Sequence, residues 1–124
     1  MSEISVIIPT FNRAEQLRLC LDSLSRQTAA PETFEVVVVD DGSTDGTEEM
    51  LRTYGAPFPL RVEQQANRGP GAARNRGIEL AAGAFCLFMD DDILADPQFV
   101  SEHLLAQRAG GGVVGGALQA VRER

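Results

Sequence analysis

Short apolar runs alternate along the chain with longer segments in which apolar residues recur at helical spacing. The apolar runs cover 5–8, 34–39 and 85–89, with a shorter one at 60–63. Glycine, proline and aspartate stand at most of the joins between the two kinds of segment. This alternation is typical of βαβ units. The sequence therefore predicts an α/β, Rossmann-like domain with three αβα layers and a mainly parallel sheet.

Polar residues at the starts of the helical segments have the pattern of capping residues. We expect Pro9 to end the first strand and Asn12 to cap the helix after it, with Glu15 as its capping-box partner. Asp45 and Asp96 are predicted to cap two later helices, the second of which would run to about residue 108. The first helix has one apolar face, formed by Leu17, Cys20, Leu21 and Leu24.

Length and charge narrow the range of functions. The 124 residues fit a single domain, 1–124, and no apolar run approaches the ~18 residues that a membrane span needs. The N-terminus has no signal-peptide pattern, so we expect a cytoplasmic protein with no membrane segment in this chain. A net charge of −7 is a poor match for nucleic acid, which we therefore exclude as a partner. Cys20 and Cys86 lie in apolar segments and are predicted to be buried packing residues.

The missing residue types exclude several kinds of chemistry. Every basic residue is an arginine, so the chain has neither a P-loop lysine nor a Schiff-base lysine. Its single histidine, His103, leaves little for a Ser-His-Asp triad or a histidine-rich metal site. Any chemistry must therefore rest on carboxylates and arginines.

Aspartate clusters follow two of the predicted strands. Asp40 and Asp41 follow the valine run, and residues 90–92, all aspartate, follow the run at 85–89. In parallel sheets ligands bind at the carboxyl ends of strands, so both clusters are candidates for one site. Three adjacent carboxylates repel one another unless a cation offsets their charge, and hard oxygen ligands suit Mn²⁺ or Mg²⁺. A solvated turn is the alternative, and it has more weight for Asp40 and Asp41.

The segment 67–77 is rich in glycine and arginine and leads into a helix. Backbone N–H groups before a helix N-terminus bind phosphate, and the side chains of Arg68, Arg74 and Arg76 would add donors. Without other support, the same segment would equally fit a surface loop.

Four motifs together resemble a known family. They are SVIIPTFNR at 5–13, VVVVDDGSTD at 36–45, NRG at 67–69 with ARNRGI at 73–78, and FMDDD at 88–92. In this order and spacing they closely resemble the family 2 glycosyltransferases of the GT-A fold, over nearly the whole chain. The resemblance implies that 1–124 is the nucleotide-sugar-binding half of such an enzyme.

The resemblance also implies roles for individual residues. Pro9, Thr10 and Phe11 would line the nucleoside pocket, while Asp41 would accept a hydrogen bond from the base, commonly uracil. Asp40 would shape the turn near the nucleoside. The diphosphate would lie along Gly69, Gly71 and Arg74. The ribose and the metal ion would face Asp90 and Asp91, and the metal ligands would be Asp90 and Asp92.

The resemblance implies an inverting transfer of a sugar, most often UDP-linked, to a hydroxyl acceptor that it does not identify. Inverting members carry a carboxylate base in their acceptor half, and neither Glu102 nor Glu123 stands in the expected motif. We therefore expect a truncated, donor-binding fragment that self-associates through an exposed edge near 110–121. The alternatives are a nucleotide-binding or interaction module without turnover and, with less support, a nucleotidyltransferase.

Overall fold

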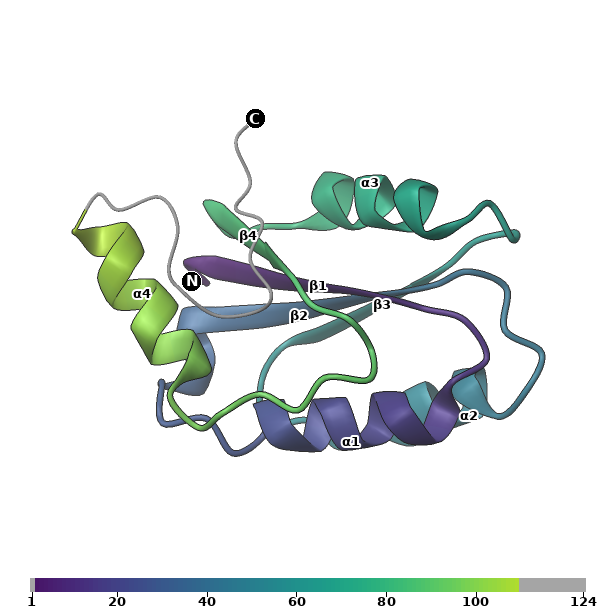
Figure 1. Cartoon of the computed structure of the whole chain (residues 1–124), viewed down its shortest axis with the longest axis horizontal. Helices are drawn as coiled ribbons and strands as arrows, with labels where there is room; N and C mark the ends of the chain where they lie inside the picture. The colour runs from purple at the N-terminus through teal and green to yellow at the C-terminus, as the bar shows by residue number, and fades with distance from the viewer. Residues whose placement is uncertain (1, 110–124) are drawn as a thin grey trace.

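The computed structural model describes residues 2–109 as one sheet with helices on its two faces (Figure 1). The strands are β1 Ile4–Thr10, β2 Phe34–Asp40, β3 Leu60–Gln64 and β4 Phe85–Phe88. The helices are α1 Ala14–Leu24, α2 Thr47–Thr53, α3 Pro70–Leu80 and α4 Phe99–Arg108, with a short 3-10 turn at Pro31–Thr33. The order of elements agrees with the predicted βαβ alternation.

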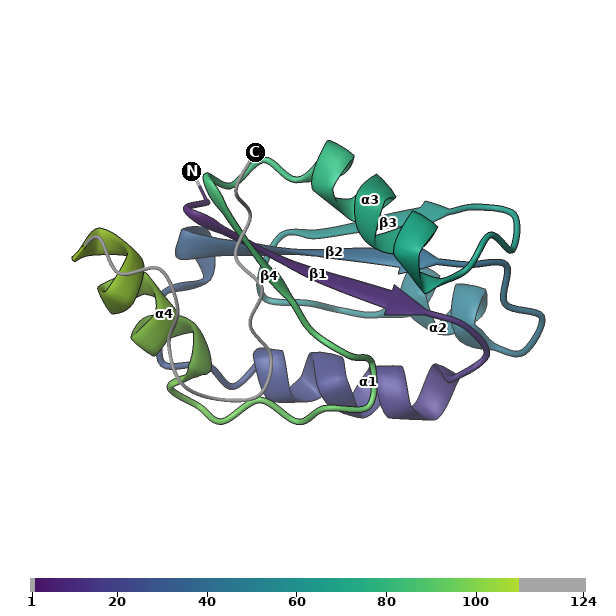
Figure 2. The same ribbon diagram turned by 45° about the horizontal axis from the view of Figure 1, so that its top comes forward.

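The four described strands form one parallel sheet in the order β3-β2-β1-β4. Helices α1 and α2 cover one face and α3 the other, while α4 lies near the end of the sheet where β1 starts (Figures 1 and 2). The predicted three-layer, mainly parallel α/β architecture is therefore confirmed. Because all strands run the same way, their carboxyl ends meet at one edge of the sheet.

Strand β2 is buried along its whole length, as its run of valines predicts. Alternate residues point to opposite faces, so Val36 and Val38 pack in the core on the α1 side, and Val37 and Val39 pack in the core under α3. The predicted inner face of α1 joins the first core with Leu17, Cys20, Leu21 and Leu24.

Helix α3 packs closely on β1 because Gly77 has no side chain. A Cβ at Gly77 would lie 2.4 Å from Cγ2 of Ile7, which is fully buried in β1. Beside this contact Ala73 and Ile78 complete the small core under the helix. The glycine thus sets the height of α3 above the sheet.

Pro9 does not end β1, and this prediction is wrong: the strand continues to Thr10. The carbonyl of Ile7 accepts the N–H of Met89, so the backbone of Ile7 faces β4, and that of Pro9, two residues on, faces the same way. The last residue pair between β1 and β4 is Ile7 with Phe88. At Pro9 the two strands are no longer paired, so the missing N–H of Pro9 interrupts no hydrogen bond between them.

Asn12 does not cap α1, and the predicted capping box is absent, since the side chain of Asn12 bonds elsewhere. Its Oδ1 accepts the N–H groups of Thr44 (2.7 Å) and Asp45 (3.3 Å), and its backbone has a φ of 53°. The N–H of Ala14, the first residue of α1, instead donates to Oδ2 of Asp45 (3.3 Å). The loops after β1 and β2 are thus fastened to each other.

The two predicted aspartate caps bond near the helix starts, but each helix begins later than its aspartate. Asp45 accepts the N–H of Thr47, where α2 begins. Asp96 accepts the N–H of Gln98 in a turn, and α4 begins only at Phe99. The predicted self-associating edge near 110–121 and Glu123 lie outside the described residues.

Both cysteines are buried, as predicted. Burial, with a smaller contribution from the nearby aspartates, raises the pKa of the Cys20 thiol to about 12, so this thiol stays protonated at neutral pH. None of the helices within 2–109 has the length and apolar character needed to cross a bilayer.

Candidate functional site

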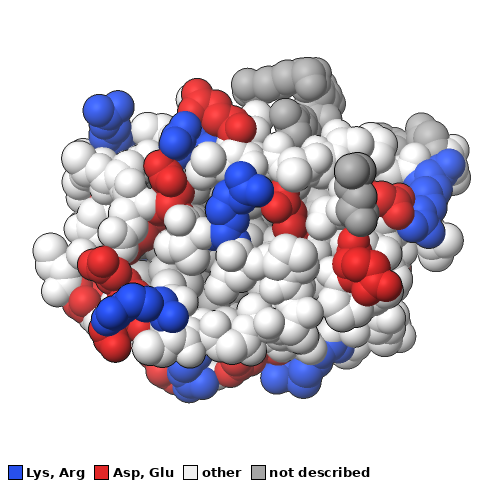
Figure 3. Space-filling view, turned by 180° about the vertical axis from the view of Figure 1, so that it is seen from behind, with Lys and Arg blue, Asp and Glu red and all other residues white. Residues whose placement is uncertain are grey.

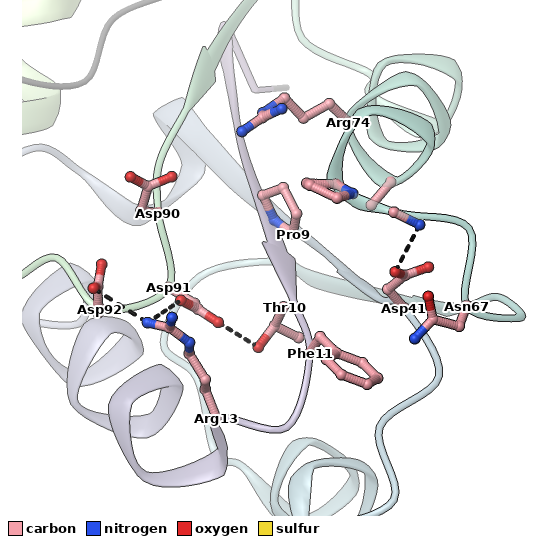
Figure 4. Close-up of a pocket in the computed structure, with 13 residues that line it drawn as sticks. Pro9, Thr10, Phe11, Arg13, Asp41, Asn67, Arg74, Asp90, Asp91 and Asp92 are labelled. Atoms are coloured by element: carbon pink, nitrogen blue, oxygen red, sulfur yellow. Dashed lines mark hydrogen bonds and ion pairs between the residues drawn. The ribbon is translucent and has the colours of Figure 1, made fainter.

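A pocket of about 530 Å³ opens at the carboxyl edge of the sheet (Figure 4). Its walls come from the ends of β1 and β4, the loop after β2, and the first turns of α3. Its lining residues are Pro9, Thr10, Phe11, Arg13, Asp41, Asn67, Gly69, Pro70, Ala73, Arg74, Asp90, Asp91 and Asp92. The volume is within the usual range for small-molecule sites.

Most of the predicted site residues meet in this pocket. The exceptions are Asp40 and Gly71, together with Arg68 and Arg76 among the predicted phosphate donors. Asp40 is almost fully buried, and its Oδ1 accepts the N–H of Ser43 (3.0 Å), so it shapes the turn without reaching the pocket. Gly71 is the second residue of α3 and lies exposed outside the pocket lining.

Asp41 is a buried anchor for the loop that leads into α3. Its carboxylate accepts the side-chain amide of Gln65 (2.8 Å) and the backbone N–H groups of Arg68 (2.8 Å) and Gly69 (2.9 Å). Burial pushes its pKa up, but these three hydrogen bonds together outweigh burial and hold the pKa below its ordinary value. Asp41 is therefore ionised at neutral pH.

The loop before α3 differs from the predicted phosphate cradle, because two of its backbone N–H groups already have an acceptor. The N–H groups of Arg68 and Gly69 are engaged by Asp41, and Gly69 adopts a φ of 97°, which other residues rarely reach. The side chain of Arg74 extends over the pocket and makes no ion pair with any residue in 2–109 (Figure 4). Arg76 instead pairs with Glu63 and Glu79. Arg74 is thus the arginine of this segment that can bind an anion in the pocket.

Phe11 gives the pocket an apolar surface. The residue is 42% exposed, although burial of a phenylalanine side chain is normally favourable. It follows β1 directly and lies beside Thr10 and opposite Asp41 (Figure 4). An exposed aromatic ring next to hydrogen-bonding groups is suited to stack on a planar base.

The three adjacent aspartates after β4 differ in their surroundings. Asp91 is buried, and its Oδ2 accepts the hydroxyl hydrogen of Thr10 (2.8 Å). Burial raises the pKa of Asp91, an effect that Thr10 and Arg13 only partly offset. Asp90 and Asp92 are exposed at the pocket. The cluster thus has one inward carboxylate that ties β4 to β1 and two that are exposed at the pocket.

Sequence reasoning missed Arg13, Asn67, Pro70 and Ala73 as pocket residues. Arg13 is the most consequential, because its Nη1 lies 3.2 Å from Oδ2 of Asp92 and 3.7 Å from Oδ1 of Asp91. The available signal was its position in the loop after a parallel strand, where ligand-binding residues gather. Asn67 begins the NRG motif, but the motif alone does not indicate a role for its side chain.

The residues present are compatible with a divalent metal ion. Within residues 2–109, no group of three or more His, Cys, Asp or Glu side chains is arranged to hold a metal. Mg²⁺ and Mn²⁺ commonly take one or two carboxylates and fill the remaining positions with phosphate oxygens and water. Asp90 and Asp92 could supply those carboxylates, so such an ion would depend on a phosphate-bearing ligand. Bound there, it would neutralise developing charge on the phosphates.

Basic and acidic side chains are interspersed on one face of the molecule. On the face seen in Figure 3, most of the blue arginines lie beside red acidic side chains. Several of the ion pairs are local, such as Arg18 with Glu15 and Asp22 on α1. The exclusion of nucleic acid as a partner stays a prediction from the sequence.

Comparison with known proteins identifies the fold and the family. The parallel αβα architecture matches solved glycosyltransferases of the GT-A fold. The family model described as glycosyl transferase family 2 matches residues 5–123. The chain therefore belongs to glycosyltransferase family 2.

Curated relatives share a third to almost half of the aligned positions. Validoxylamine A glucosyltransferase of Streptomyces hygroscopicus subsp. limoneus is 45% identical over 109 residues, which cover 86% of this chain and 24% of the relative. TarS of Staphylococcus aureus, a poly(ribitol-phosphate) beta-N-acetylglucosaminyltransferase, is 38% identical over 112 residues, covering 83% and 20%. The chain thus spans about a quarter of the length of such relatives.

Solved structures give the same picture. The structure of S. aureus TarS 1-349 in complex with UDP-GlcNAc superposes with a TM-score of 0.81 at 36% identity, covering 86% of this chain and 31% of that protein. The mannosyltransferase PcManGT of Pyrobaculum calidifontis, in complex with GDP-Man and Mn²⁺, gives 0.69 at 34% identity, covering 74% and 28%. Both neighbours hold a nucleotide sugar, and the second holds a metal ion as well.

Proposed function

We propose that the pocket binds a nucleotide-diphosphate sugar, with UDP as the nucleotide and Mn²⁺ or Mg²⁺ as the ion, and forms the donor half of a glycosyltransferase site. The observation that carries the proposal is the meeting, in one pocket of about 530 Å³, of an aromatic ring, an anchored carboxylate, two exposed aspartates and an arginine with no ion-pair partner among residues 2–109. Each matches one part of such a donor.

The base and ribose would lie along the end of β1. The ring of Phe11 offers a stacking surface, and Asp41 is held ionised with its oxygens beside the pocket, so it can accept a base N–H. Asp91 also faces this region, and contact with the ribose is its proposed role. UDP is the nucleotide we favour because the TarS complexes contain UDP or UDP-GlcNAc.

The diphosphate would lie between Arg74 and the aspartates of β4. The guanidinium of Arg74 can make paired hydrogen bonds to phosphate oxygens. Asp90 and Asp92 would hold the metal ion on the other side, so that the anionic donor does not face bare carboxylates. The bound ion would stabilise the nucleoside diphosphate as it leaves.

Transfer itself, which we propose to invert the anomeric centre, needs a base that the described pocket does not offer. An inverting reaction requires a carboxylate close to the acceptor hydroxyl. Of the carboxylates after Asp92 within the described residues, neither Asp96 nor Glu102 lines the pocket. We therefore propose that donor binding belongs to these residues and that the base and the acceptor site come from elsewhere in the active enzyme.

Calorimetric titration of UDP tests this proposal. In the presence of Mn²⁺ the chain should bind UDP, and both EDTA and Asp92→Asn should weaken binding by at least ~10-fold, the equivalent of ~1.4 kcal/mol. Glu102→Gln removes the same charge from the exposed face of α4 and should leave binding unchanged. UDP binding that is equal with Mn²⁺ and with EDTA would refute the metal site, and no binding of UDP or GDP at all would refute the donor pocket.

A further inference from the structure

Arg13 places a positive charge directly at Asp91 and Asp92, the second of which is a proposed metal ligand. Its Nη1 donates to Oδ2 of Asp92 (3.2 Å) and lies 3.7 Å from Oδ1 of Asp91 (Figure 4). Asp92 is thus one of the two exposed carboxylates that would hold a divalent ion, and it already has a cationic partner. The guanidinium and the ion would therefore compete for the same oxygen.

The backbone of Arg13 is fixed while its side chain can move. The preceding residue, Asn12, is bonded through its N–H to Ser43 and through its side chain to Thr44, and the carbonyl of Arg13 accepts the N–H of Leu17 in α1. In contrast, the side chain is 49% exposed and that of Asp92 is 48% exposed. An ion pair with this much exposure is weak, so the guanidinium can leave Asp92 at little cost.

A second anion could receive the displaced guanidinium. Arg13 and Arg74 both line the pocket and extend into it from different elements, the start of α1 and the helix α3 (Figure 4). A diphosphate in the pocket would lie within reach of both. Arg13 would then exchange a carboxylate for a phosphate when the donor binds, and Asp92 would become open to the metal.

We propose that Arg13 acts as a built-in counter-cation of Asp91 and Asp92, so that a divalent ion binds weakly alone and strongly once a nucleoside diphosphate has drawn Arg13 away. This inference rests on the proposed function, since it assumes the same donor and metal site. It assigns Arg13 a positioning role that makes metal and nucleotide binding depend on each other. Such coupling is reciprocal, so each ligand must raise the affinity for the other by the same factor.

The test is a set of Mn²⁺ titrations followed by electron paramagnetic resonance of the unbound ion, without UDP and with saturating UDP. An exposed ion pair contributes up to about 1 kcal/mol, and a contribution of about 0.4–1 kcal/mol would make Arg13→Gln bind Mn²⁺ alone about 2- to 5-fold more tightly than the wild type. With UDP present the advantage should disappear, so the coupling factor in the variant falls by the same 2- to 5-fold. Arg13→Lys keeps the charge and should stay closer to the wild type.

Arg18→Gln is the matched control, because it removes the same charge away from the pocket: within residues 2–109, the ion pairs of Arg18 are with Glu15 and Asp22 on α1. It should leave Mn²⁺ affinity unchanged. If Arg13→Gln binds Mn²⁺ alone no more tightly than the wild type, or if Arg18→Gln tightens binding equally, the inference is wrong while the donor site stands. Failure of the wild type to bind Mn²⁺ even with UDP would overturn the proposed function and this inference with it.

Discussion

The close packing of α3 on β1 predicts a large difference between two glycine-to-alanine substitutions in one helix. At Gly77 the new Cβ would lie 2.4 Å from Cγ2 of Ile7, about 1 Å too close for van der Waals contact. Ile7 is fully buried and β-branched, so it cannot turn away easily. Overpacking of this kind costs about 2–3 kcal/mol, of which alanine's better helix propensity offsets about 0.5–1, leaving a net loss of about 1–2.5 kcal/mol.

Gly71→Ala supplies the comparison, since nothing lies within 4 Å of its Cβ position. It should gain up to ~1 kcal/mol, so urea denaturation should separate the two variants by about 2–3 kcal/mol. In an Ile7→Ala background the clashing methyl is absent, and Gly77→Ala should then cost almost nothing. Equal stability of Gly77→Ala and Gly71→Ala would refute the reasoning, as would a Gly77→Ala cost that Ile7→Ala leaves unchanged.

Three further predictions concern the site and its surroundings. Arg74→Gln should weaken UDP binding by about 10-fold in calorimetry because a charged phosphate contact is lost, whereas Arg76→Gln, which breaks pairs outside the pocket, should lower stability and spare UDP binding. The pKa of Asp41 is lowered in the folded chain from its ordinary 3.8, so ionised Asp41 stabilises the fold above pH ~4, and this contribution is lost as the pH falls through its folded pKa. Thermal scans between pH 6 and pH 2.5 should show that the Tm of the wild type falls more steeply with falling pH than the Tm of Asp41→Asn. An identical dependence of Tm on pH in both proteins would contradict the role of the hydrogen bonds of Asp41. Because burial raises the pKa of Cys20 to about 12, its thiol should react with a thiol-specific disulfide reagent only after urea is added, and rapid reaction in the native state would count against the described packing.

The sheet was predictable because its strands follow simple rules. A valine run buried on both faces can hardly be anything but a central strand, and the periodic apolar residues of 17–24 fix the inner face of α1. Where prediction failed, a tertiary contact decided the outcome. Pro9 continues a strand because β4 has already ended beside it, and sequence alone does not contain that register.

The candidate site shows the same division. Motifs at the carboxyl ends of strands correctly placed Asp41 and residues 90–92 at one pocket, since parallel topology brings those ends together. Which side chains bond to one another, however, depends on distances in the folded chain, and spacing in the sequence does not give these distances. The side chain of Asn12 ties two loops together instead of capping a helix, and Arg13 reaches across to Asp92, 79 positions away in sequence.

The most direct test of the proposed donor site is to locate the nucleotide by nuclear magnetic resonance, titrating UDP with Mg²⁺ into the ¹⁵N-labelled chain. If UDP binds in the pocket at the carboxyl edge of the sheet, we expect saturable shifts of the backbone amides around it, at Thr10, Asp41, Gly69, Arg74 and Asp91. A second pocket of about 280 Å³ lies between α2 and β3, and its lining residues are Glu48, Leu51, Arg52, Val62 and Gln64. Shifts confined to that second pocket, or no saturable shifts anywhere, would contradict the assignment of the donor site.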